Sequence, residues 1–246
     1  MPNWSRFRSL ASVGLLAVLS LVATKVEAQT RVDLQLVLAV DASGSVSNER
    51  FILQQHGYSA AFRSPRLLQA ILGGTNRAIA VTMTQWTGPI QHLQVVPWFY
   101  INDERSMHAF ADAVDGAQRQ LFGGGTSISG AIDHAMTLLS DTSFAGGRRV
   151  IDVSGDGANN RGRPAEQARD DAVSQGVNIN GLPILALEPN LDDYYRNHVI
   201  GGPGSFVIVA TTYESFAEAV LRKLIIEISG DGTSSRPVVV ASNEAE

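Results

Sequence analysis

The chain has 246 residues, of which 44% are hydrophobic, and it carries a formal charge of −5 at pH 7. This length and apolar content fit a single α/β domain with a substantial core, and two full domains would be cramped. The absence of cysteine excludes disulfides, zinc–thiolate sites and thiol nucleophiles, and an acidic chain without a basic cluster argues against nucleic acid as a partner.

The first 28 residues have the pattern of a secretory signal peptide. Arg6 and Arg8 precede an apolar run from Leu10 to Ala23, and a small-residue cleavage site ends at Ala28. The apolar run is shorter than the about 20 residues that a membrane-spanning helix needs, so we predict cleavage and not a retained anchor. No later segment is suited to span a bilayer, and we expect a periplasmic or secreted protein. Residues 29–246 would then hold 16 basic and 23 acidic residues, a formal charge of −7.

The chain then alternates between strand and helix patterns. The nearly continuous apolar run at 32–40 predicts a strand buried on both faces of a sheet. Ser47 and Asn48 are suitable N-caps for a helix that ends before Pro65. Residues 78–86 and 90–100 are rich in β-forming residues and are separated by a turn sequence, which predicts two antiparallel strands in a hairpin.

The second half of the chain continues this alternation. Helices are predicted at 102–117, around Ile132 to Leu139, from near Pro164, and as a closing amphipathic helix from Phe216 to Ile228. Strands are predicted at 150–153, 177–187 and 206–209. Residues 230–246 lack a periodic pattern and are predicted to be a flexible tail. The expected organisation is therefore a signal peptide at 1–28, one domain at 29–229 and the tail.

Alternating strands and helices predict a doubly wound, mostly parallel sheet with one antiparallel edge strand and helices on both faces. In such sheets, ligands bind beyond the carboxyl ends of the strands. Three polar loops, "DASGS", "GGGTS" and "SGDG", follow or adjoin such ends and supply oxygen-bearing side chains from Asp41, Ser43, Ser45, Thr126 and Asp156. Hydroxyls with two carboxylates are donors suited to Mg²⁺, which prefers octahedral oxygen ligands.

Each of these residues also has an ordinary interpretation when it is taken alone. An Asp-x-Ser segment is common in turns, Thr126 is suited to cap the following helix, and Asp156 between glycines is compatible with a plain loop. Their joint occurrence after the appropriate elements favours the metal site. The glycine-rich loop lacks the lysine of a phosphate-binding P-loop, so nucleotide binding is not favoured.

The pattern resembles the metal-ion-dependent adhesion site of von Willebrand factor type A domains. That family has an Asp-x-Ser-x-Ser loop, a distant threonine and a later aspartate, in the order seen here. The resemblance implies that Ser43, Ser45 and Thr126 bind the metal directly, that Asp41 and Asp156 act largely through bound water, and that a partner's carboxylate fills the open position. This chain departs from the family at Gly155, where a threonine is common, which affects the support of Asp156.

The phrases "VIDVSGDGANN" and "MTQWTG" further resemble an exported bacterial subfamily of unknown function (DUF1194-like). The leading hypothesis is an exported, non-enzymatic protein-binding module that uses Mg²⁺, or Mn²⁺ or Ca²⁺, to coordinate an acidic residue of a partner. Two alternatives stay open: a metal-dependent phosphoester hydrolase, and a type A-like interaction domain without metal.

Overall fold

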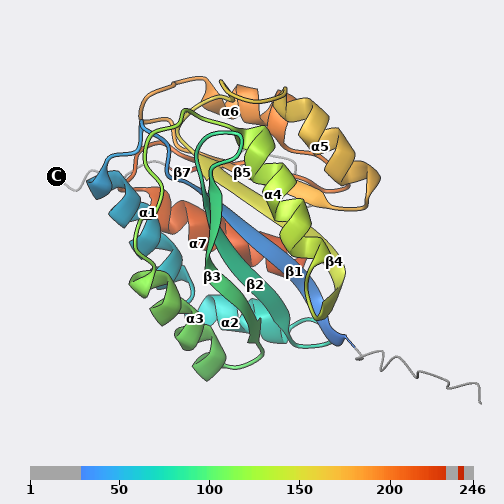
Figure 1. Ribbon diagram of the computed structural model, residues 1–246. Coiled ribbons are helices and arrows are strands. Elements are labelled where there is room, and N and C mark those ends of the chain that lie inside the picture. The colour runs from blue at the N-terminus through green and yellow to red at the C-terminus, as the bar shows by residue number, and fades with distance from the viewer. Residues whose placement is uncertain (1–28, 231–237, 241–246) are drawn as a thin grey trace, which may run out of the picture.

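The computed structural model describes residues 29–230 and 238–240. The predicted signal peptide and most of the predicted tail lie outside these residues. The largest sheet has five strands: β1 (Thr30–Asp41), β2 (Ile79–Trp86), β3 (His92–Ile101), β4 (Phe144–Gly155) and β5 (Asn178–Pro183). Their spatial order is β3-β2-β1-β4-β5, and only β3 runs antiparallel to its neighbour within this sheet. The predicted mostly parallel sheet with one antiparallel edge strand is confirmed (Figure 1).

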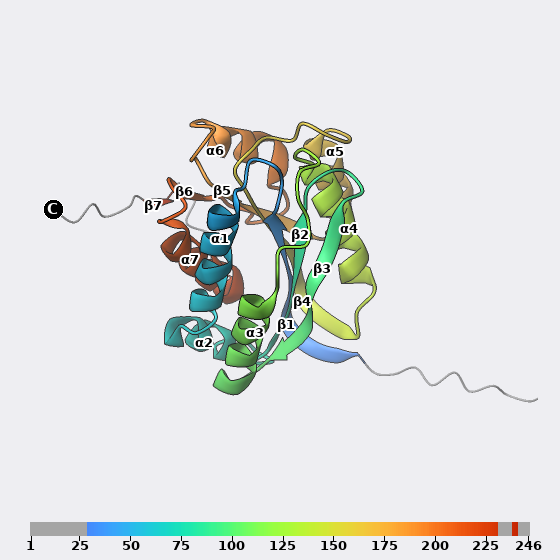
Figure 2. The ribbon, with the colours of Figure 1, turned by 60° about the vertical axis from the view of Figure 1, so that its left-hand side comes forward.

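Helices cover both faces of this sheet (Figure 2). One face is covered by α1 (Asn48–Ala61), α2 (Pro65–Leu72), α3 (Glu104–Gly116) and α7 (Phe216–Ser229), and the other by α4 (Ile128–Ser140) and α5 (Ala165–Ser174). A short helix α6 (Leu191–Tyr194) and a π-helical turn η1 (Tyr195–Val199) follow β5 and pack into the same core as α4 and α5.

The side chains of β1 explain this two-sided arrangement. Alternate residues of a strand point to opposite faces of a sheet. On β1, one set of side chains packs into the core beneath α1 and α7: Leu34, Leu36, Leu38 and Val40. The other set, Val37 and Ala39, packs into the core beneath α4 and α5. All of these side chains are buried, as the apolar run predicted for a central strand.

The structure also differs from the sequence prediction in the extent of several elements. Helix α2 was not predicted, because Pro65 was interpreted only as the end of the preceding helix, whereas proline is also favoured in the first turn of a new one. Strand β4 begins at Phe144 and not at residue 150, and β5 ends at Pro183 and not at residue 187. Strand β6 (Ile208–Ala210) lies beside β5, and β7 (Val238–Val240), within the predicted tail, pairs parallel with β6. None of the helices in the described part of the chain could cross a membrane.

Candidate metal centre

The ends of β1 and β4 bring two acidic residues to one edge of the sheet. Asp41 is the last residue of β1, and Asp156 directly follows Gly155, the last residue of β4. The two strands are parallel neighbours, with Val40 opposite Ser154, so their carboxyl ends lie side by side. Both aspartates are almost fully buried, with exposed fractions of 0% and 1%. Two carboxylates removed from water this far need a compensating charge or hydrogen bonds.

Asp41 is only half satisfied by the protein. Its Oδ1 accepts a 2.7 Å hydrogen bond from the main-chain N of Ser43, while its buried Oδ2 has no hydrogen-bond partner among the described residues. Oδ2 faces Gly155: a β-carbon at that position would lie 2.8 Å from Oδ2 and 3.0 Å from the hydroxyl of Tyr195, which is also unpartnered within the described chain. The glycine that replaces the family's threonine therefore leaves room for Asp41. Burial and the charge of Asp156 raise the pKa of Asp41 to about 7.

Asp156, in contrast, is held by three side chains. Its Oδ1 accepts a 2.5 Å hydrogen bond from Ser45 Oγ, and its Oδ2 accepts a 2.8 Å hydrogen bond from the hydroxyl of Tyr213. The guanidinium of Arg50 lies 3.8 Å from the same Oδ2. Burial and the negative charge of Asp156 raise the pKa of Tyr213, which keeps the phenol protonated as a donor. The glycine at position 155 offers Asp156 no hydroxyl, and Ser45, Tyr213 and Arg50 supply its contacts instead.

The three hydroxyl residues of the predicted site gather around these carboxylates. Ser43 Oγ and Ser45 Oγ lie 3.1 Å apart, and Ser43 is buried whereas Ser45 is exposed. Thr126 lies in the adjacent loop, and its Oγ1 would be 3.6 Å from a β-carbon at Gly157, next to Asp156. The structure therefore brings all five predicted residues to the same edge of the sheet, from three separate loops.

Residues that the sequence analysis did not select hold the first loop in place. Gln54 on α1 donates a 3.2 Å hydrogen bond to the main-chain oxygen of Asp41. Arg119 donates from one Nη to the main-chain oxygens of Ala42 and Ser43, at 2.9 and 3.1 Å, and from the other to Asn48 Oδ1 at 3.0 Å. Nothing in the sequence near Arg119 indicates this role, because the contact spans 76 or more residues along the chain.

Two asparagines hold the third loop against the second. Asn160 Oδ1 accepts a 3.0 Å hydrogen bond from the main-chain N of Thr126, and Asn159 Oδ1 accepts one of 3.1 Å from that of Ser129. The sequence left open whether these asparagines contact a ligand or make turns; here both connect the loops that carry Thr126 and Asp156.

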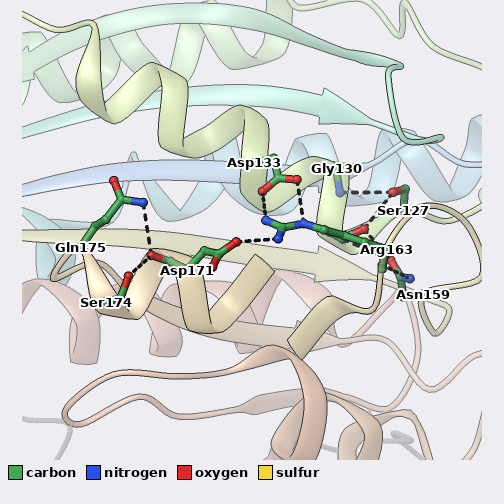
Figure 3. A network of polar contacts seen from close by, with 9 residues as sticks. Ser127, Gly130, Asp133, Asn159, Arg163, Asp171, Ser174 and Gln175 are labelled. Carbon is green, nitrogen blue, oxygen red and sulfur yellow. Dashed lines mark hydrogen bonds and ion pairs between the residues drawn. The ribbon is translucent and has the colours of Figure 1, made fainter. Parts of the chain in front are cut away.

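Arg163 anchors the end of the same loop between two helices (Figure 3). It forms a bidentate pair with Asp133 on α4, with distances of 2.6 and 3.2 Å, and a 2.5 Å pair with Asp171 on α5. Its main-chain oxygen accepts a hydrogen bond from the amide of Asn159. The loop is therefore attached at both ends to regular structure, which limits the positions that Asp156 can take.

The donor chemistry of this site fits a hard divalent cation. It offers hydroxyl oxygens, two carboxylates and one buried carboxylate oxygen without a partner. No three histidine, cysteine, aspartate or glutamate side chains gather as a possible metal site in the described residues, so an ion at this site would depend on the hydroxyl oxygens as well as on the two carboxylates. The residues that would hold an ion are Ser43, Ser45 and Thr126, with Asp41 and Asp156 behind them.

Comparison with solved structures shows similarity in fold. Proximal thread matrix protein 1 from the mussel byssus has 13% identity and a TM-score of 0.58, over 82% of this chain and 49% of that one. The pilus adhesin SpaC from Lactobacillus rhamnosus GG has 15% identity and a TM-score of 0.58, over 82% and 31%. A von Willebrand factor type A protein from Catenulispora acidiphila has 16% identity and a TM-score of 0.52, over 81% and 43%. The chain thus spans about half of these proteins or less.

Among proteins with curated descriptions, none matches the chain. A family described as "Protein of unknown function (DUF1194)" matches residues 31–232. That match covers every described strand and helix from β2 to α7 and nearly all of β1. The chain therefore belongs to this family of unknown function, and its fold is that of a von Willebrand factor type A-like domain.

Proposed function

We propose that this protein is an exported, non-enzymatic protein-binding module that holds a divalent metal ion, Mg²⁺ in the first instance, and uses it to coordinate an acidic residue of a partner. The observation that carries the proposal is the buried Oδ2 of Asp41, which has no partner in the described structure and lies at the edge shared by Ser43, Ser45, Thr126 and Asp156. An unpaired carboxylate oxygen in a dry position is costly, and a bound cation removes that cost.

The charge of the site supports a partner with a carboxylate. The two aspartates and Arg50, which lies 3.8 Å from Asp156, together carry about one negative unit, and a divalent ion more than compensates for the charge of these three groups. When bound, the ion supplies an electrophilic centre that accepts one further oxygen ligand. The hydroxyls of Ser43 and Ser45 bring no negative charge of their own, so an anionic oxygen from a partner is favoured at the open position.

One of the similar structures supports the proposal of a divalent ion in this fold. One structure of proximal thread matrix protein 1, with 12% identity and a TM-score of 0.55, has zinc in its metal-ion-dependent adhesion site. That ion belongs to the mussel protein. Its presence there supports the proposal that the same fold in this chain can hold a divalent ion. Mg²⁺, Mn²⁺ and Ca²⁺ are the ions proposed here because all the donor atoms of the site are oxygens.

Thermal unfolding with chelator and then with increasing Mg²⁺ tests the metal site. A ligand that binds only the native state, at about ten times its Kd, adds about 1.4 kcal/mol of stability, which is an increase of roughly 3 to 6 °C for a domain of this size. We expect this increase in the wild-type protein and its loss in Ser43→Ala and Asp41→Asn. Asp41→Asn keeps the oxygen that accepts from Ser43 N but removes the charge.

Ser140→Ala is the matched control, because Ser140 is an exposed serine at the end of α4. It should keep the full response to Mg²⁺. An equal Mg²⁺ response in Asp41→Asn would contradict the proposed site. Hydrolysis of a phosphoester that depends on Mg²⁺ and disappears in Asp156→Ala would overturn the non-enzymatic assignment.

A further inference from the structure

Three arginines lie around the candidate metal centre, although residues 29–246 are acidic as a whole. The guanidinium groups of Arg50 and Arg119 are already engaged: Arg50 contacts Asp156 and donates to the main-chain oxygen of Ser45 at 3.1 Å, and Arg119 donates to the main chain of the first loop. The guanidinium of Arg161 has neither a hydrogen bond nor an ion pair within residues 29–230, and the residue is exposed. Of the three, only Arg161 is available to a partner.

The backbone of Arg161 is fixed next to the threonine of the site. Its main-chain N donates a 3.1 Å hydrogen bond to the main-chain oxygen of Thr126. The neighbouring Asn160 makes two further hydrogen bonds to Thr126: its main-chain N donates to the same oxygen, and its side-chain Oδ1 accepts from Thr126 N. The position of the Arg161 α-carbon is therefore coupled to that of Thr126. The Arg161 main chain is thus held beside the loop that carries Thr126.

The side chain of Arg161 lies against Gly125, the residue before Thr126. Gly125 has a positive φ of 78°, and a β-carbon there would lie 2.7 Å from Arg161 Cγ and 3.3 Å from its Nε. Any other residue would both strain the loop and displace the arginine. The side chain lies against the main chain of Gly125 and ends in an unpaired guanidinium, whose planar donors match a carboxylate in a bidentate manner.

Glu188 also lies near the site, and its negative charge would repel an anionic ligand, but its carboxylate is bound to the loop. A β-carbon at Gly157 would lie 3.5 Å from Glu188 Oε1, and Glu188 Oε2 accepts a 3.2 Å hydrogen bond from the main-chain N of Ala158. Since Glu188 is directed to the 157–158 main chain, it is partly satisfied. Arg161 is the group beside Thr126 that has an unused charge.

We propose that Arg161 binds a second carboxylate, so that the partner presents two neighbouring acidic groups: one for the metal ion and one for Arg161. This inference rests on the proposed function, because the first carboxylate is the one at the metal. It narrows the class of partner from any exposed acidic residue to a paired acidic segment, and it makes Arg161 a specificity-determining residue of the site.

Glutarate and butyrate are suitable probes, because they differ chiefly in the second carboxylate. Binding of each is measured by titration calorimetry or NMR in millimolar Mg²⁺, with the full protein. We expect glutarate to bind about tenfold more tightly than butyrate, beyond the statistical factor of its two carboxylates, because a charge-assisted bidentate contact is added. Arg161→Gln should remove this preference while leaving butyrate binding and the Mg²⁺ response unchanged.

Arg66→Gln is the matched control. Arg66 is an exposed arginine on α2, at the end of the molecule away from the candidate metal centre (Figures 1 and 2), and its variant should keep the full preference for glutarate. A tenfold preference that persists in Arg161→Gln would overturn the inference, as would a wild-type protein that binds both probes equally in Mg²⁺; in both cases the proposed function stands. If neither probe binds in the presence of Mg²⁺, the proposed function fails and this inference fails with it.

Discussion

The described part of the chain contains two buried acidic clusters, and they are compensated in different ways. In the core, Asp152 on β4 and Glu227 on α7 lie 2.6 and 2.5 Å from Lys223 Nζ, and all three side chains have an exposed fraction of 0%. At the candidate metal centre, the nearest cation is Arg50, 3.8 Å from Asp156, with about a third of its side chain exposed. The core cluster contains a buried cation that contacts both carboxylates, whereas the cation closest to the carboxylates of the site is farther away and partly exposed.

The difference separates a cluster that is compensated within the chain from one for which we propose a bound cation. Lys223 reaches both carboxylates, and burial together with the charge of Asp152 raises the pKa of Glu227 to about 7, so a proton can supply the remaining positive charge. Asn180 also donates a 2.9 Å hydrogen bond to Glu227. We infer that this cluster is neutralised from within the chain, whereas the cluster of Asp41 and Asp156 is to be neutralised from outside. Three changes test that comparison.

Lys223→Met should have the largest effect, because it leaves Asp152 and Glu227 buried without a cation. Removing one partner of a buried ionic group costs about 3 to 5 kcal/mol. Denaturant unfolding measures this loss. Arg222→Met, an exposed neighbour on the same helix, should change the stability by less than about 0.5 kcal/mol.

A neutral version of the core cluster keeps this test decisive if Lys223→Met fails to fold. Combining Lys223→Met with Asp152→Asn and Glu227→Gln removes all three charges, so no uncompensated charge stays buried. We expect the triple variant to be more stable than Lys223→Met alone. If the free energy of unfolding of Lys223→Met lies within about 1 kcal/mol of the wild-type value, Lys223 does not compensate the two carboxylates.

The pH dependence of stability should show the second effect. Because the pKa of Glu227 is about 7 in the folded protein and near 4.5 when unfolded, the folded state binds more protons between these values. Its contribution to stability is therefore complete below about pH 4.5 and is lost as the pH rises through 7, a decrease on the order of 3 kcal/mol. Glu227→Gln should flatten the curve in this window. A wild-type curve that is unaffected by the substitution would contradict a raised pKa at Glu227.

Arg50→Gln should have the smallest effect of the three changes, and it should strengthen an interaction, the binding of Mg²⁺, where Lys223→Met weakens the fold. This guanidinium is the cation nearest to Asp156, so its removal leaves the site more negative and should tighten Mg²⁺ binding by about two- to fivefold, the small value reflecting its exposure. Mg²⁺ titration followed by thermal unfolding measures the affinity. Arg63→Gln is the control, since Arg63 pairs with Asp112 and Asp115 away from the site. Weaker Mg²⁺ binding in Arg50→Gln would mean that Arg50 organises the loop more than it competes with the ion.

The sequence by itself determined the fold class and the five residues that meet at the candidate site. The apolar run of β1 indicated a central strand because both of its faces are buried, and the position of Asp41 at the end of that run followed directly. Parallel strands bring their carboxyl ends to one edge, so the "DASGS" and "SGDG" loops could be expected to meet there. Whether these residues bind a metal ion stays a prediction.

Only the tertiary structure decided how the charges of the molecule are compensated. Tyr213 reaches Asp156 across 57 residues, and Lys223 meets Asp152 because α7 packs beside β5 and β6. Periodicity in a sequence reports which face of an element is buried, but it does not specify which residues of two distant elements lie opposite each other. That choice depends on helix packing and strand register, and here it separates a carboxylate pair that contacts a buried lysine from one that does not.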